Sequence, residues 1–224
     1  VEMLVEIEWA LARAMRESRS KRAPEMIELI RRVYIGGESL QEGLRNLLAD
    51  MEKVRISMTD EAAFEVGRNI AVTPGAVVWE HELLQLVQYA PATAKVHERA
   101  LVMVPPCINK FYIMDLRPEN SLVGYPVEEG HTVFMVSWRN VQQRHERVTW
   151  DDYIAALVEA LGEVASITGV KSMNVLGFCI GGTLAAAALA VLERQGRNPA
   201  ASLTLLTTLL DFTDVGEIRV YIDD

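Results

Sequence analysis

A glycine-flanked cysteine between an apolar run and an alanine-rich run constrains the fold of this chain more than any other feature. Residues 173–176 predict a short buried strand, and residues 180–195 predict a helix. Between them, Gly177 and Gly181 flank Cys179. A strand can pass directly into a helix at this spacing only if the backbone crosses itself closely, and side chains in place of the two glycines would collide. The sequence therefore predicts a tight strand–helix turn with Cys179 at its tip.

A cysteine in this position is a candidate nucleophile. The N-terminus of a helix carries roughly half a positive charge and unpaired N–H groups, which favour a thiolate over a thiol. The backbone N–H of Ile180, the next residue, is placed to donate to the oxyanion of a tetrahedral intermediate. The competing interpretation is an inert cysteine buried in a structural turn, since free cysteines are often buried. The strand and helix beside the motif favour the catalytic interpretation, because they define a nucleophile elbow.

The spacing of apolar residues divides the chain into two parts. In residues 1–60 apolar side chains recur every three or four residues, which predicts a helical N-terminal region. Three helices are expected there. The first covers residues 4–15, the second begins at Pro24, and the third is capped by Ser39. In residues 61–224 short apolar runs alternate with amphipathic stretches, which predicts parallel βαβ units. Strands are expected at residues 77–79, 82–89, 101–104, 132–136, 173–176 and 203–207, and long helices at 150–168 and 180–195.

We therefore expect an α/β fold of the α/β-hydrolase type, in which a mostly parallel sheet carries the nucleophile. In that fold the second oxyanion donor comes from the loop after an earlier core strand. The loop that begins with Pro105 and Pro106 fits this place, which makes the backbone N–H of Ile108 or Asn109 the candidate donor. A rigid structural loop would account for the two prolines equally well. Cys107 lacks flanking glycines and is expected to be a packed bystander.

A nucleophile also needs a base and an acid that orients the base. In the α/β-hydrolase fold both follow the nucleophile in the sequence. All four histidines of this chain, however, precede Cys179: they are His81, His97, His131 and His145. Surface roles are expected for His131 and His145, and Asp211 is expected to cap a loop. Residues 61–224 are therefore expected to form the first half of a catalytic core that is incomplete at its C-terminus.

Composition excludes several other classes of protein. The net charge of −9, without a basic cluster, argues against nucleic-acid binding. The two cysteines form no Cys-x-x-Cys pair and the histidines lie far apart, so neither a disulfide framework nor a metal site is expected. No apolar run reaches the roughly 20 residues of a membrane span, and the N-terminus does not have the pattern of a signal peptide. We expect a soluble protein of the reducing cytoplasm.

Several motifs extend the pattern around the cysteine. They are PPCINKFYIMDL (residues 105–116), GHTVF (130–134), SWRN (137–140), TWDDY (149–153) and NVLGFCIGGT (174–183), with EAAFEVGRNIAV (61–72) as a lead-in. Together they resemble the polyhydroxyalkanoate synthases, most closely the class I enzymes. The resemblance covers the chain from about residue 37 to its end.

The resemblance implies an acyltransferase that polymerises (R)-3-hydroxyacyl-CoA, with 3-hydroxybutyryl-CoA the expected substrate, and releases CoA. Cys179 would hold the acyl group as a thioester, without a cofactor. The family's aspartate and histidine lie downstream of this cysteine and are absent from this chain, so the chain alone is not expected to polymerise. The resemblance also implies a homodimer at the surface of cytoplasmic polymer granules, in contact with the growing polyester. Lys110 or Arg139 is expected near the CoA phosphates.

Two alternatives stay open. In a cysteine-type α/β-hydrolase, such as a thioesterase or a lactone hydrolase, water would attack the acyl-enzyme in place of a hydroxyacyl hydroxyl. A granule-associated scaffold would keep the fold without catalysis. Free hydroxy acid as the only product would indicate the first alternative, and the absence of a downstream base in the natural protein would indicate the second.

Overall fold

A computed structural model describes residues 38–54, 56–57 and 62–221. The chain divides into two compact units between Ala63 and Phe64. In the first unit, helix α3 (Glu38–Lys53) confirms the third predicted helix. The helix includes Ser39, so the prediction that this residue caps it is wrong. The two helices expected before residue 37 lie outside the described residues.

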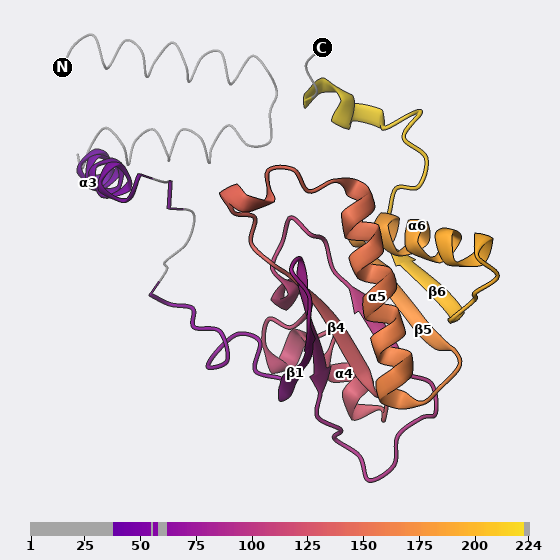
Figure 1. The fold of residues 1–224 in the computed structure, drawn as a ribbon. Helices are drawn as coiled ribbons and strands as arrows, with labels where there is room; N and C mark the ends of the chain where they lie inside the picture. Colours follow the sequence, from indigo (N-terminus) through magenta and orange to yellow (C-terminus); the bar gives the residue numbers. More distant parts are fainter. Residues whose placement is uncertain (1–37, 55, 58–61, 222–224) are drawn as a thin grey trace, which may run out of the picture. The chain divides into compact units, whose positions relative to one another are not determined.

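The second unit is built on a six-stranded sheet (Figure 1). Its strands are β1 (Gly75–Glu80), β2 (Leu84–Tyr89), β3 (Leu101–Val104), β4 (Val133–Trp138), β5 (Met173–Phe178) and β6 (Ala200–Leu206). Their order across the sheet is β1-β2-β4-β3-β5-β6. Strands β4, β3, β5 and β6 run parallel to one another. The pairs β1–β2 and β2–β4 are antiparallel. The predicted α/β fold with a mostly parallel sheet is confirmed.

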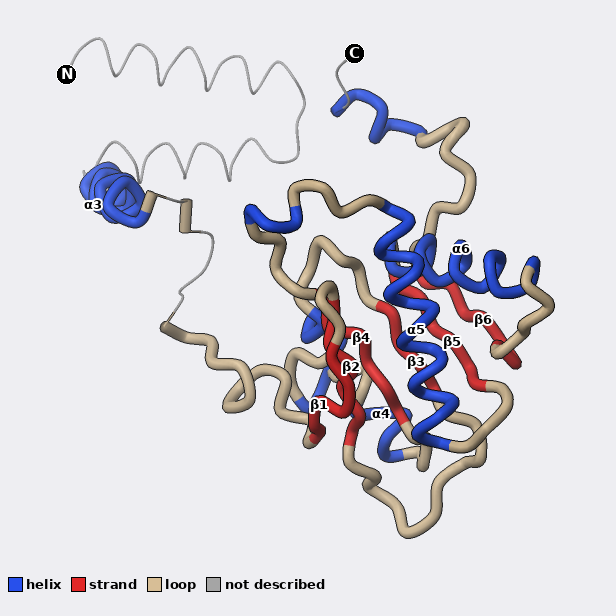
Figure 2. The backbone as a smooth tube through the Cα atoms, viewed as in Figure 1, coloured by secondary structure: helices blue, strands red, loops and turns tan. Residues whose placement is uncertain are grey.

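Helices cover the two faces of the sheet (Figure 2). On one face, α5 (Trp150–Thr168) and α6 (Ile180–Arg194) pack together against alternate residues of the central strands, such as Val102 and Val104 of β3. On the other face, the short helix α4 (Gly124–Glu128) and the 3₁₀ turn η1 (Phe111–Met114) cover Met103 and Met135. Because neighbouring strand residues point to opposite faces, this two-sided burial explains the uninterrupted apolar runs of β3 and β4.

Helix α5 has the end signals that its sequence predicts. Thr149 is the N-cap: its Oγ1 accepts from the Asp152 N–H at 3.3 Å, and the Asp152 carboxylate accepts from the Thr149 N–H at 2.7 Å. This reciprocal pair satisfies two N–H groups that the first turn of a helix leaves without partners. At the other end, Gly169 adopts φ 69° as the C-cap. Three further 3₁₀ turns, which the sequence did not predict, complete the unit at Pro118–Asn120, Gln143–His145 and Gly216–Tyr221.

Candidate active site

The structure contains the predicted tight turn between β5 and α6. Cys179 is the residue between strand and helix, and its backbone adopts φ 53° and ψ −128°. A positive φ is unusual for a residue with a side chain and persists only where the surroundings impose it. Here the Cys179 N–H donates to the Leu206 carbonyl of β6 at 2.9 Å, and the Cys179 carbonyl accepts from the Gly182 N–H at 2.9 Å. The backbone N–H and the carbonyl of Cys179 are therefore both hydrogen-bonded, which holds this strained residue in place.

Close backbone contacts explain the glycines around the cysteine. A Cβ atom at Gly177 would lie 2.3 Å from the Gly182 Cα atom, because the chain crosses itself there. A Cβ atom at Gly181 would lie 2.3 Å from the Val104 carbonyl oxygen and 2.4 Å from that of Pro105. Both distances are shorter than atoms tolerate, so neither position has room for a side chain. The structure therefore confirms the prediction that a side chain at either position would collide with the backbone.

Gly182 is a third required glycine, which the sequence reasoning missed. A Cβ atom at this position would lie 2.0 Å from Oγ1 of Thr208, in the loop after β6. The neighbouring Thr183 hydroxyl donates to the Leu209 carbonyl at 2.9 Å, which holds the same loop against the first turn of α6. The only sequence signal was the second glycine of the Gly181–Gly182 pair, because the residue that it contacts lies 26 positions away in the chain.

The two cysteines differ in their surroundings. Cys179 is exposed, whereas Cys107 is half-buried. Cys107 packs against the core on the α5 side, which agrees with its predicted role as a bystander. Burial raises the pKa of the Cys107 thiol. Burial therefore disfavours the thiolate, the nucleophilic form, at Cys107.

The loop after β3 lies beside the turn, as the contact between Gly181 and Pro105 shows. Within this loop the Asn109 N–H donates to the Pro106 carbonyl at 3.3 Å. No hydrogen bond of the described residues engages the Ile108 N–H. The N–H of Ile180 belongs to the first helical residue of α6, where the helix itself supplies no acceptor. These three N–H groups stay the predicted oxyanion donors, and those of Ile108 and Ile180 are uncommitted by the fold.

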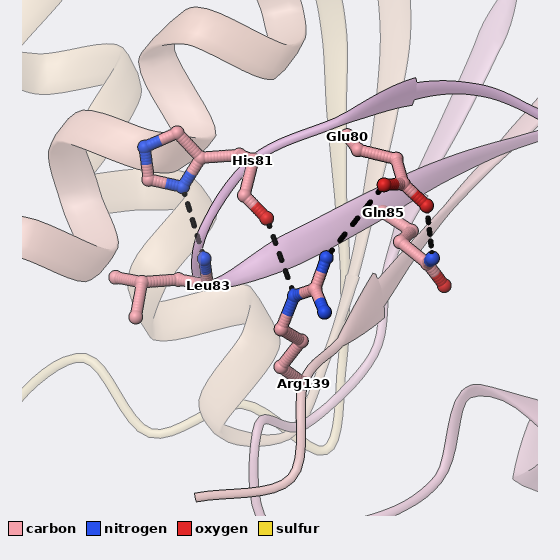
Figure 3. A network of polar contacts seen from close by, with 5 residues as sticks. All are labelled: Glu80, His81, Leu83, Gln85 and Arg139. Carbon is pink, nitrogen blue, oxygen red and sulfur yellow. Dashed lines mark hydrogen bonds and ion pairs between the residues drawn. The ribbon is translucent and has the colours of Figure 1, made fainter. Parts of the chain in front are cut away.

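Residues of this loop, including Ile108 and Asn109, line a cavity of about 380 Å³. Lys110 and Arg139 both contribute to its lining, together with Cys107, Trp138 and Tyr153. The Lys110 ammonium donates to the Asn140 side chain. The Arg139 guanidinium lies 3.8 Å from the Glu80 carboxylate and donates from Nε to the His81 carbonyl at 3.4 Å, as Figure 3 shows. Of the two cations that were expected near the CoA phosphates, Arg139 is thus already paired with the Glu80 carboxylate.

Cys179 lines neither this cavity nor three further ones on the described part of the chain. The cysteine instead stands on an open surface at the carboxyl ends of β3 and β5. This is the edge of a parallel sheet at which α/β proteins bind their ligands.

The histidines do not meet the cysteine in the described residues. His81 accepts from the Leu83 N–H at 3.1 Å, and the His97 and His131 rings lie 4.6 Å apart. The predicted surface role of His145 is wrong, because the residue is only 5% exposed. Its ring turns inward to close a 3₁₀ turn, where Nδ1 accepts from the Gln142 N–H at 3.0 Å. His131 is half-buried, and its Nδ1 atom is sealed without a hydrogen-bond partner.

Asp211 caps a loop, as predicted. Its Oδ1 atom accepts from the Thr213 N–H at 2.9 Å and from the Thr213 hydroxyl. These hydrogen bonds, the one from the hydroxyl first, hold the pKa of Asp211 below its usual value. The structure therefore gives this carboxylate a local structural role.

Residues 38–54, 56–57 and 62–221 contain no group of three or more His, Cys, Asp or Glu side chains that could hold a metal ion. In the same ranges no helix combines the length and the apolar character that crossing a bilayer requires.

Comparison with protein families gives two overlapping matches. Residues 14–126 match the model described as the N-terminus of poly-beta-hydroxybutyrate polymerase (PhaC). Residues 102–223 match the model of the alpha/beta hydrolase fold, which includes the whole turn at Cys179.

Curated relatives agree with these matches. The chain is 59% identical over 90% of its length to the poly(3-hydroxyalkanoate) polymerase subunit PhaC of Cupriavidus necator, covering 34% of that protein. It is 41% identical over 84% of its length to the poly(3-hydroxyalkanoate) polymerase of Methylorubrum extorquens, covering 32% of that protein. The chain thus spans about a third of the length of these relatives. Among solved structures it is similar to the esterase rPPE, with 17% identity over 73% of this chain and 51% of that chain and a TM-score of 0.49.

Proposed function

The chain belongs to the poly-beta-hydroxybutyrate polymerase family, and from this premise we propose that it carries the nucleophile of an acyltransferase that polymerises (R)-3-hydroxyacyl-CoA. The proposed substrate is 3-hydroxybutyryl-CoA. The observation that carries the proposal is the exposed Cys179 in a strained turn at the N-terminus of α6. This turn presents a thiol at the edge of the sheet, beside the N–H of Ile180, for which the helix itself supplies no acceptor.

The proposed reaction has two steps. The Cys179 thiolate attacks the carbonyl carbon of the substrate thioester, and the carbon–sulfur bond to CoA breaks as CoA leaves and takes up a proton. The hydroxyl group of a second acyl unit then attacks the carbonyl carbon of the Cys179 thioester and loses its proton to a base. The ester bond of the polymer forms as the carbon–sulfur bond to Cys179 breaks and the Cys179 thiolate leaves. A thiol suits the first step, because exchange between a thiolate and a thioester replaces one carbon–sulfur bond with another.

The backbone around Cys179 supports the first step. The Ile180 N–H, with that of Ile108 or Asn109, is proposed to donate to the oxyanion that forms on the attacked carbonyl. Lys110 and Arg139, at the cavity lined by the loop after β3, are proposed to lie near the phosphates of CoA.

The second step needs a base, and no histidine follows Cys179 in this chain. The family resemblance puts the base and its acid partner downstream of the nucleophile. We therefore propose that this chain, by itself, becomes acylated at Cys179 but does not build polymer. Dimerisation and association with the polymer granule belong to the same proposal.

The experiment is to incubate the purified chain with (R)-3-hydroxybutyryl-CoA and to follow released CoA by chromatography and protein acylation by intact mass. We expect one acyl group, which peptide mapping places on Cys179 and which Cys179→Ala abolishes. Cys107→Ala is the matched control and is expected to be acylated like the unchanged chain. Catalytic release of free hydroxy acid would favour the hydrolase, and the absence of any acylation would favour the scaffold.

A further inference from the structure

Trp138, the last residue of β4, is buried beneath the loop that follows β3. The residue is 7% exposed, and its indole N–H donates to the Pro105 carbonyl at 2.8 Å. Pro105 and Pro106 have no backbone N–H, so this part of the loop cannot donate hydrogen bonds that would hold it in place. The indole N–H of Trp138, in a core strand, supplies the hydrogen-bond donor that this part of the loop lacks.

The same carbonyl group also lies close to the turn at Cys179. A Cβ atom at Gly181 would lie 2.4 Å from the Pro105 oxygen and 2.6 Å from its carbonyl carbon. The Pro105 peptide is therefore held between the indole of Trp138 and the backbone of Gly181. Any movement of this peptide changes the distance between the loop and the first turn of α6.

The Tyr153 ring of α5 holds the indole in place from the other side. The two ring centroids lie 5.4 Å apart with planes inclined by 53°, an arrangement typical of packed aromatic pairs. The indole thus has a fixed orientation, which makes the direction of its N–H fixed as well.

We infer that Trp138 is a positioning residue for acyl transfer: its indole N–H sets the place of the backbone from Pro105 to Asn109 relative to Cys179. The inference rests on the proposed function, in which an N–H of this loop donates to the oxyanion. Such a donor works only at about 2.7–3.1 Å from the developing charge, and loss of one donor slows acyl transfer by roughly 10²–10³. A donor that is displaced and not removed has a smaller effect.

The test compares Trp138→Phe, which keeps an aromatic ring but removes the N–H, with Trp79→Phe, the same substitution in β1 at a residue that does not line the cavity. In single-turnover acylation of the chain by (R)-3-hydroxybutyryl-CoA, we expect Trp138→Phe to lower the saturating rate about tenfold, with little change in the half-saturating concentration. Alkylation of Cys179 by iodoacetamide passes through no oxyanion and should change by less than about twofold. Amide hydrogen exchange should become faster in the peptide that spans Pro105 to Asn109. Trp79→Phe should match the unchanged chain in all three measurements.

The outcomes separate the inference from the proposed function. An unchanged chain that is alkylated at Cys179 but never acylated would contradict the proposed function, and the exchange measurement would still decide whether Trp138 orders the loop. Normal acylation, or normal exchange in the loop, of a folded Trp138→Phe variant would overturn the inference alone. Equal losses of acylation and alkylation would also overturn it, since they would indicate damage to the cysteine turn. If Trp138→Phe does not fold, a tryptophan analogue with sulfur in place of the indole N–H, introduced at position 138, preserves the ring volume and gives the same test.

Discussion

Gly177 and Gly182 lie against each other where the chain crosses itself: a Cβ atom on Gly177 would lie 2.3 Å from the Gly182 Cα atom and 2.9 Å from its nitrogen. The atoms on both sides of this contact belong to the backbone, so no side-chain rotation can relieve a collision. The exposed position and the positive φ of Cys179 depend on this crossing. The stability of the turn can therefore be tested independently of its chemistry.

We expect Gly177→Ala and Gly181→Ala to lower the free energy of unfolding by about 3 kcal/mol or more, because each added methyl group overlaps backbone atoms. Urea unfolding followed by circular dichroism measures this change. Gly162→Ala is the matched control, since Gly162 lies inside α5 with no atom within 4 Å of the added Cβ. That variant should be more stable by about 0.5–1 kcal/mol, as expected for alanine in place of glycine inside a helix. Equal effects at the three positions would contradict the structure of the turn.

Gly182 differs because the atoms that it excludes belong to a side chain. A methyl group there would overlap Oγ1 and Cγ2 of Thr208, at 2.0 and 2.8 Å. We expect Gly182→Ala to be destabilising and Thr208→Gly to relieve part of the loss. The double variant should therefore be more stable than the sum of the two single changes predicts, with a coupling of about 1 kcal/mol or more. A double-mutant cycle of urea unfolding measures this coupling, and strictly additive effects would show that the two residues do not touch.

The sequence predicted the parts of the fold that depend on local pattern. All six strands were found from short apolar runs. Burial on both faces explains the uninterrupted runs of β3 and β4, whereas β1 and β6 are largely exposed. The turn at Cys179 was found because glycine spacing and flanking elements are both local signals. The antiparallel direction of β1 and β2 was not predicted, since apolar content does not encode strand direction.

Most of the errors occurred where distant residues decide the outcome. His145 is the exception: it lies in a polar stretch, and its ring turns inward to accept from the Gln142 N–H, three residues away. Gly182 is required by Thr208, and the Pro105 carbonyl is held by Trp138, 33 residues further along the chain. The sequence alone does not show that the end of β4 lies beside the loop after β3. It therefore could not predict the contact between Trp138 and Pro105.

The two thiols provide a test of the exposed nucleophile. At neutral pH we expect iodoacetamide to modify Cys179 at least about tenfold faster than Cys107, since Cys179 is exposed whereas burial raises the pKa of the Cys107 thiol. Peptide mapping by mass spectrometry after timed quenching gives both rates from one sample. In 8 M urea the two rates should converge, because unfolding removes the difference in burial. Faster modification of Cys107 in the folded chain would contradict the placement of the nucleophile.

The cap of α5 makes stability depend on pH in a predictable direction. Hydrogen bonds from the Thr149 backbone N–H and then from its hydroxyl lower the pKa of Asp152. A carboxylate with a lowered pKa stabilises the folded state above its unfolded pKa, about 4 for aspartate, and this stabilisation is lost as the pH falls through the lower folded value. Asp152→Asn should therefore reduce the urea midpoint at pH 7, and the difference from the unchanged chain should shrink below pH 4. Asp151→Asn removes the same charge from the neighbouring position without breaking the cap, so it should retain the acid-dependent loss. If the deficit of Asp152→Asn were the same at pH 7 and at pH 2.5, the carboxylate would not be the group through which Thr149 stabilises the start of this helix.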